Sequence, residues 1–424
     1  MKTLALLSLA VGALGAHLAG CAADDTADSQ CEPDETDCGG DDGGKADGTV
    51  GNAAQMNDLT IVMPLAKSQT EFGGYIAATA TGANGVLFPN KPYTTEFPDR
   101  TSTGIGSDVT MTYAKLRVVA VRFDPCFAQI GPITDPATCD NQIRVVFQDL
   151  TFGGGTTNAI DGAVHAFYRV DRAELTKAIR EVIDLRKANG QTRTMGPLAP
   201  HPLLVKQGLD GAFGQGLAKI LLAHAGTKNL IRFTHFQSSN LQTTWGFSGF
   251  DVSPAGKATM MVIPTLPSSG TSVSFFAGFA APIAGGFTPG TKSADNVALL
   301  VNITNAKAAT KANAQKAFDA TLRIENPNFH SPNTIDCASC HIAETARMLI
   351  GEDKLHLTSD NADDVFSADA RYVSARNAKA TTSPRGQSIN LHMISYRNSS
   401  LLIGQRVINE TANVVAYVNG TMHP

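Results

Sequence analysis

Residues 115–123, Lys-Leu-Arg-Val-Val-Ala-Val-Arg-Phe, decide the fold class of this chain. The run is rich in β-branched residues and holds no turn former, so it predicts a long strand that is largely buried. Residues 142–148 predict a second strand, in which Ile143, Val145 and Phe147 alternate with other side chains and share one face. The first half of the chain is therefore built around β-structure.

Further elements are predicted outward from these two strands. Asp171 and Glu174 have the spacing of a capping box, and an apolar stripe after them predicts a helix that stops at Gly190. Other helices are predicted at residues 209–221, 306–322, 342–350 and 405–418, and other strands at residues 58–65, 74–81, 229–236, 258–263, 272–279 and 296–302. The expected class is α+β, with a β-rich domain of unknown family at residues 51–300 and a smaller, mainly helical region at residues 301–424.

The composition excludes several classes of protein. The chain has 424 residues, of which 43% are apolar and only 17% are charged, with a net charge of −4. A nucleic-acid-binding protein should show a strongly basic face, which this balance does not support. Roughly 400 residues exceed what one core usually holds, so more than one domain is expected.

The amino terminus has the features of an export signal. Lys2 is followed by an apolar run that ends in Leu18-Ala19-Gly20-Cys21. A basic start, an apolar stretch and small residues before a cut site define a secretory signal peptide, here residues 1–21. The last four residues resemble the lipobox of bacterial lipoproteins. The resemblance implies cleavage before Cys21, acyl chains on Cys21, and a lipid anchor in the cell envelope of a bacterium, at the outer membrane, periplasm or cell surface.

An acidic segment follows the signal peptide. Residues 22–47 hold ten acidic side chains and one lysine and almost no large apolar residue, so residues 22–50 are expected to be a disordered tether. Cys31 and Cys38 lie in this tether. They form either a small disulfide loop, which we favour, or part of a metal site together with the carboxylates.

The other cysteines form two pairs. An exported chain should not keep an unexplained thiol, and once Cys21 takes the lipid, six of the seven cysteines remain. Cys126 and Cys139 bracket a 14-residue loop between the two strands described first. A disulfide that closes such a loop is worth about 3 kcal/mol in the chain-entropy model, so we predict this pairing.

The last pair of cysteines belongs to the motif that points most directly to a function. Cys337-Ala338-Ser339-Cys340-His341 is a C-x-x-C-H motif. Three alternatives are weaker: residues 333–336 do not form the strand that precedes a thioredoxin-like site, a structural zinc site needs four ligands, and a disulfide across two residues is strained. The motif resembles the haem-attachment site of c-type cytochromes. It implies one haem c bound covalently to Cys337 and Cys340, with His341 as the proximal iron ligand.

The rest of the carboxy-terminal region also resembles a small single-haem cytochrome c. Met393, 52 residues after His341 and shortly before the last predicted helix, stands where that family places its distal methionine. His392, His356 and His330 are alternative ligands, and an iron with no second protein ligand is a further possibility.

One feature departs from the family pattern, in which a helix leads directly into the motif. Here Pro327 and Pro332 interrupt the approach.

These patterns predict a lipid-anchored, exported haem protein that transfers single electrons to a redox partner that the sequence does not name. None of the usual catalytic signatures is present in the sequence, so an electron carrier is expected rather than an enzyme. A cell-surface binding lipoprotein with a structural haem is the first alternative. A haem-based ligand sensor is the second, and it would require an open iron position.

Overall fold

The computed structural model describes residues 53–91, 111–126, 140–191, 197–238, 244–260, 274–277, 297–301, 303–330, 337–359, 361–373, 380 and 391–424. All of these residues belong to one compact unit, Gly48–Pro424. The predicted signal peptide, Cys21 and the tether with Cys31 and Cys38 lie outside the described residues, as does Cys139. Cys126 takes part in a disulfide.

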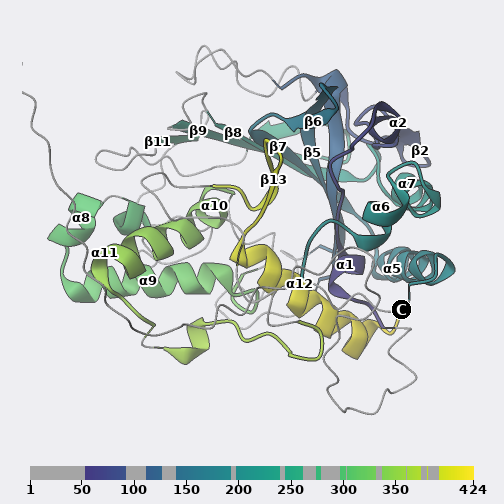
Figure 1. The fold of residues 1–424 in the computed structure, drawn as a ribbon. Coiled ribbons are helices and arrows are strands. Elements are labelled where there is room, and N and C mark those ends of the chain that lie inside the picture. Colours follow the sequence, from purple (N-terminus) through teal and green to yellow (C-terminus); the bar gives the residue numbers. More distant parts are fainter. Residues whose placement is uncertain are drawn as a thin grey trace, which may run out of the picture. The chain divides into compact units, whose positions relative to one another are not determined.

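A large sheet forms the centre of this unit (Figure 1). Its strands run antiparallel in the order β1-β4-β5-β7-β8-β9-β10, while β6 pairs with β5 and β11 pairs in parallel with β9. Their bounds are β1 (Thr60–Val62), β4 (Leu116–Asp124), β5 (Gln142–Gly153), β6 (Thr156–Ala159), β7 (Gly162–Arg169), β8 (Leu230–Ser238), β9 (Thr244–Val252), β10 (Ala258–Met260) and β11 (Ser274–Ala277).

The central strands are buried on both faces. Phe147, on the predicted apolar side of β5, packs on Phe88, which also contacts Phe233. Val146, which points to the other face, is just as deeply buried. Alternation in β5 predicted one buried face; the second is buried because carboxy-terminal segments cover it.

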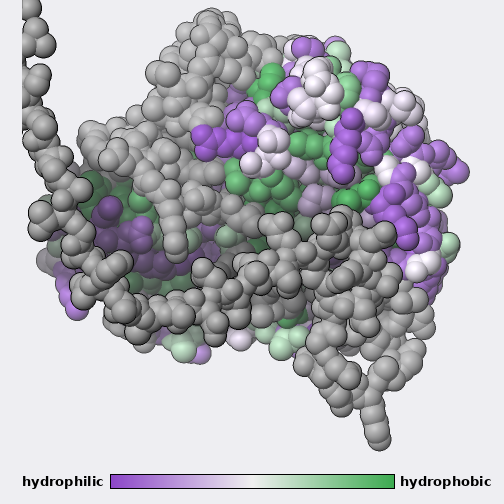
Figure 2. Space-filling view, viewed as in Figure 1, coloured by the Kyte–Doolittle hydropathy of each residue, from purple (hydrophilic) through white to green (hydrophobic). Residues whose placement is uncertain are grey.

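Helices flank the strands. α5 (Arg172–Ala188) begins as predicted, because the Asp171 side chain accepts a hydrogen bond of 2.7 Å from the backbone N–H of Glu174. α1 (Met56–Leu59), α2 (Gln69–Gly73), α6 (Pro202–Gln207) and α7 (Ala212–His224) complete this part. The outer sides of α5 and α7 carry mainly hydrophilic side chains (Figure 2).

Helices dominate the carboxy-terminal part, which also contains one hairpin. The elements are α8 (Ile303–Ala308), α9 (Lys311–Glu325), α10 (Cys337–Thr345), a π-helical continuation of α10 at Ala346–Glu352, α11 (Asp353–Leu355), the hairpin β12 (Ile394–Arg397) and β13 (Ser400–Ile403), and α12 (Gln405–Tyr417). The predicted α+β class is confirmed. Within the described ranges, every helix is too short or too polar to cross a bilayer.

Some predicted strands are wrong. Val297–Val301, predicted as a strand, forms a 3₁₀ helix. Residues 74–81 meet β4 only through isolated hydrogen bonds, such as Val118 N–H to the Ile76 carbonyl at 2.9 Å, before the short pair β2 (Thr81–Gly82) and β3 (Gly85–Val86). Gly74 lies so close to the backbone of Asp210 that a Cβ would sit 2.6 Å from its nitrogen, so packing against this loop sets the local path.

The two regions predicted as separate domains share one core. Gln148 in β5 donates a hydrogen bond of 2.9 Å to the Tyr396 carbonyl and accepts one of 2.6 Å from the Tyr396 N–H. At the opposite end of the carboxy-terminal part, the Asn419 side chain bonds both backbone groups of Ala54, at 2.8 and 2.9 Å. The segment after residue 300 therefore completes the sheet core instead of standing apart from it.

Candidate functional site

The C-x-x-C-H motif lies at the start of α10, which begins at Cys337. The side chain of Cys337 lies outside the described residues. The thiol of Cys340 is partly buried and is not in a disulfide. Because α10 rests against β9, the helix carries the next residue of the motif, His341, onto the sheet.

His341 is buried against aromatic side chains of the sheet. Its ring centre lies 4.7 Å from that of Phe236 in β8 and 5.4 Å from that of Phe247 in β9. Its Nδ1 makes a short hydrogen bond with the carbonyl oxygen of Leu391. Since a carbonyl only accepts, Nδ1 must carry the proton.

The protonation state of His341 follows from its surroundings. The pKa of His341 is lowered to about 4, mainly by burial, with the hydrogen bond to Leu391 acting in the opposite direction and the nearby His392 adding a smaller decrease. The imidazole is therefore neutral at pH 7, with its proton on Nδ1 and a lone pair on Nε2. This is the form in which histidine binds a metal.

A second imidazole faces His341. His165, in the middle of β7, has its ring centre 6.4 Å from that of His341, with the ring planes at 67°. Burial holds the pKa of His165 well below its ordinary value, and the charges of Arg144, His341 and Arg122 add to the effect. The Nε2 of His165 is buried and has no hydrogen-bond partner among the described residues. A buried polar atom without a partner is rare and calls for a physical explanation.

Two of the predicted distal ligands already have other neighbours. The sulfur of Met393 packs against Gly404, where an added Cβ would lie 2.6 Å from it. The Nε2 of His392 lies 2.5 Å from a carboxylate oxygen of Asp161.

The other two predicted ligands lie elsewhere. His330 follows α9, and its carbonyl accepts a hydrogen bond from Arg406. His356 is exposed and ends α11 in a left-handed conformation, with φ of 53°. Thus the structure brings His165, which sequence reasoning had not singled out, onto His341. No pattern in the sequence pointed to it, because residues 162–169, which form β7, were not among the predicted strands.

A buried cluster of charges borders the site. Glu410 in α12 accepts a hydrogen bond of 2.6 Å from Arg122 and is also paired with Arg406, while Asp124 lies 3.0 Å from both Arg122 and Arg144. Three guanidinium groups thus surround two carboxylates, which leaves one excess positive charge. The charges of Arg122 and Arg144 reach His165, and that of Arg122 also reaches Cys340.

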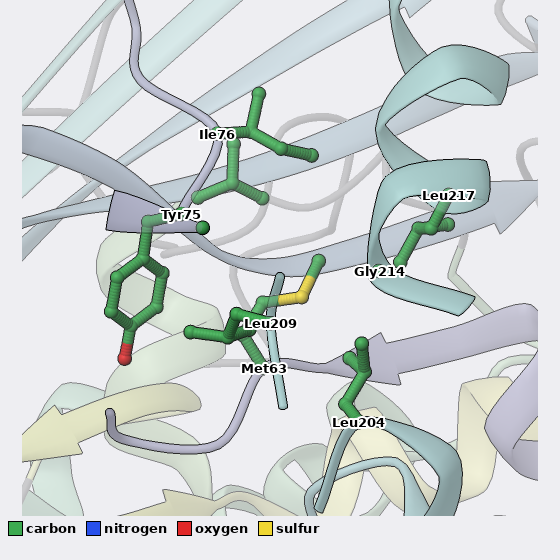
Figure 3. Close-up of a pocket in the computed structure, with 9 residues that line it drawn as sticks. Met63, Tyr75, Ile76, Leu204, Leu209, Gly214 and Leu217 are labelled. Carbon is green, nitrogen blue, oxygen red and sulfur yellow. The ribbon is translucent and has the colours of Figure 1, made fainter. Parts of the chain in front are cut away.

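Other types of site find less support. In the ranges that the structure describes, no three histidine, cysteine, aspartate or glutamate side chains gather closely enough to hold a bare metal ion. A recess between the β1 loop, α6 and α7 is lined by aliphatic side chains such as Met63, Leu204 and Leu217 (Figure 3). Its one phenol, Tyr75, already donates a hydrogen bond of 2.7 Å to the Pro64 carbonyl. The recess is therefore a feature of side-chain packing, and it does not support a catalytic site.

The donor set at His341 is compatible with an iron porphyrin. A neutral imidazole has its Nε2 available, a second imidazole has an Nε2 without a partner, and two cysteines stand at the haem-attachment spacing. Comparison of the chain with protein-family models, with curated proteins and with solved structures gave no match.

Proposed function

We propose that this protein binds one haem c through Cys337 and Cys340, with His341 as the proximal iron ligand, and that it transfers single electrons. The observation that supports this most is the state of His341. Its imidazole is buried and neutral, and the Leu391 carbonyl fixes the tautomer in which Nε2 can bind iron. A hydrogen bond from the other ring nitrogen is what orients a histidine ligand and raises its basicity.

The haem supplies the redox chemistry when bound, and the protein controls its surroundings. Phe236 and Phe247 keep water away from the His341 ring. The excess positive charge of the arginine cluster favours the reduced state of a nearby redox centre, because reduction adds a negative charge. These groups tune a reduction potential; in this proposal none of them acts as an acid or a nucleophile.

This proposal gives the sheet a role. β7, β8 and β9 supply His165, Phe236 and Phe247, which form the wall against which His341 packs. In this proposal, the segment from residue 51 to 300 surrounds the haem site. This role accounts for the length of the segment better than the alternative of an unrelated binding module.

The proposal is tested on the unmodified protein, produced in a bacterium that matures c-type cytochromes. After denaturation and electrophoresis, the protein band should retain peroxidase-type haem staining, because thioether bonds survive denaturation. The native protein should show an absorption spectrum that changes on reduction with dithionite. A folded protein without any haem stain would disprove the proposed function.

We further propose that the lipobox-like sequence anchors the chain through lipid on Cys21 to a bacterial envelope membrane. Cys21→Ser should move the protein from the membrane fraction to the soluble fraction, because no thiol remains to accept the lipid. Cell fractionation and blotting measure this, with Cys31→Ser as the control that should stay on the membrane. Equal membrane retention of Cys21→Ser would contradict the anchor.

A further inference from the structure

We propose that His165 is the second axial ligand of the iron, so that one ligand comes from α10 and the other from the middle of the sheet. This inference rests on the proposed haem site and goes beyond it, since it names the distal ligand. It replaces Met393 as the expected distal ligand with an imidazole more than 170 residues away from His341 in sequence.

The separation of the two rings matches a metal held between them. A bond from a metal to an imidazole nitrogen is about 2 Å long, and the ring centre lies about 1 Å behind that nitrogen, so two axial imidazoles have centres about 6 Å apart. The centres of His165 and His341 are 6.4 Å apart. At this separation the rings are too far apart for a direct hydrogen bond and are well placed to share one atom between them.

The hydrogen-bond pattern points the same way. His341 uses Nδ1 for the Leu391 carbonyl and keeps Nε2, while the buried Nε2 of His165 has no partner in the described part of the chain. The free-energy cost of burying an unpartnered nitrogen is removed if that atom binds a metal. His392 differs, because its Nε2 lies against the Asp161 carboxylate.

The sheet fixes His165 rigidly. It pairs with Val146 on β5 and with Thr234 on β8, so it stands in the interior of a sheet and not on a loop. The same register places Phe236, two residues after Thr234, on the same face, where it contacts His341. Ligands on rigid elements keep their geometry during a change of oxidation state.

This ligand decides between the functions that the sequence left open. Two imidazoles fill both axial positions, so the iron has no site for a small molecule, and electron transfer is favoured over ligand sensing. The reduction potential is then lower than a methionine ligand would give, because a thioether favours the reduced iron.

The first test needs no substitution. The oxidised wild-type protein should give a low-spin electron paramagnetic resonance spectrum without the far-red sulfur-to-iron absorption band, and the reduced protein should not bind carbon monoxide. A sulfur-to-iron band would show that the ligand is a methionine, as the sequence predicts for Met393. A high-spin spectrum or ready carbon monoxide binding would mean an open position. Either result would overturn this inference and leave covalent haem attachment intact.

The second test is His165→Ala. The haem stain should persist, the low-spin signal should be replaced by a high-spin one, the reduced protein should bind carbon monoxide, and added imidazole should restore the low-spin spectrum. His235→Ala is the matched control, because His235 stands on the neighbouring strand and pairs with Val164, not with His165. An unchanged low-spin spectrum in His165→Ala would rule out His165 as the ligand, whereas a wild-type protein without haem stain would instead refute the proposed function.

Discussion

Replacing Cys337 and Cys340 together with alanine is expected to abolish covalent haem staining completely. The stain depends on thioether bonds, and these two cysteines are the only ones at the spacing that places both sulfurs at one edge of a porphyrin. Each single substitution should leave one thioether and therefore a weaker stain. Densitometry of the stained gel, normalised to protein, measures the loss.

The control for this variant is Ser339→Ala, which changes the same turn of α10 and leaves both thiols in place. Its stain should equal that of the wild type. Circular dichroism of the double variant separates loss of attachment from loss of fold. Staining that persists in the double variant would show that the haem is attached elsewhere or not covalently.

Glu410→Gln is expected to lower the free energy of unfolding by about 3–5 kcal/mol, the range for removing one partner of a buried ion pair. Glu410 lies between Arg122 and Arg406 and is almost fully buried. Its loss leaves three buried guanidinium groups with Asp124 as the one remaining carboxylate of the cluster. Urea unfolding followed by tryptophan fluorescence or circular dichroism gives the difference.

The pH dependence of this loss of stability tests whether the negative charge of Glu410 is its cause. Burial alone would raise the pKa of Glu410, but the charges of Arg406, Arg122 and Arg144 outweigh it and hold the pKa well below 4.5. A lowered pKa in the folded state stabilises the fold above the ordinary pKa, and this stabilisation disappears as the pH falls. The difference between Glu410→Gln and the wild type should therefore stay constant above about pH 5 and shrink in acid.

The matched control is Glu352→Gln. Glu352 also pairs with an arginine, Arg347, but its side chain is 40% exposed and Arg347 keeps Glu325 as a second partner. Exposed pairs contribute about 0–1 kcal/mol, so this change should be small at every pH. Equal losses in the two Glu→Gln variants would contradict the view that burial sets the cost.

The local sequence pattern was enough to predict the elements whose formation depends on neighbouring residues. The capping residue Asp171 set the start of α5, and the apolar run after Lys115 set β4. The strand predicted at residues 296–302 was wrong because an apolar run of that length fits a buried helix as well as a strand. At these residues, tertiary packing rather than intrinsic propensity determines that a helix forms and not a strand.

Only half of the candidate site could be predicted from the sequence. His341 was found because its motif is contiguous. His165 could not be singled out from the sequence, because its partner comes from a segment far along the chain and only the register of β7 brings the two rings together. Met393 was favoured by its spacing in the family that the motif resembles, and in this fold its sulfur packs against Gly404.

The contacts of α12 also bear on when the protein can fold. Asn419 bonds Ala54, and the hydroxyl groups of Thr411 and Thr60 are 2.7 Å apart, so α12 and the residues that follow it close onto β1 and the residues that precede it. A growing chain without α12 lacks Glu410, and Arg122 then has no carboxylate from that helix. Contacts of such high sequence separation form late and slowly. We therefore expect the segment around Cys337 to stay accessible to a haem-attachment machinery until α12 docks on the rest of the fold.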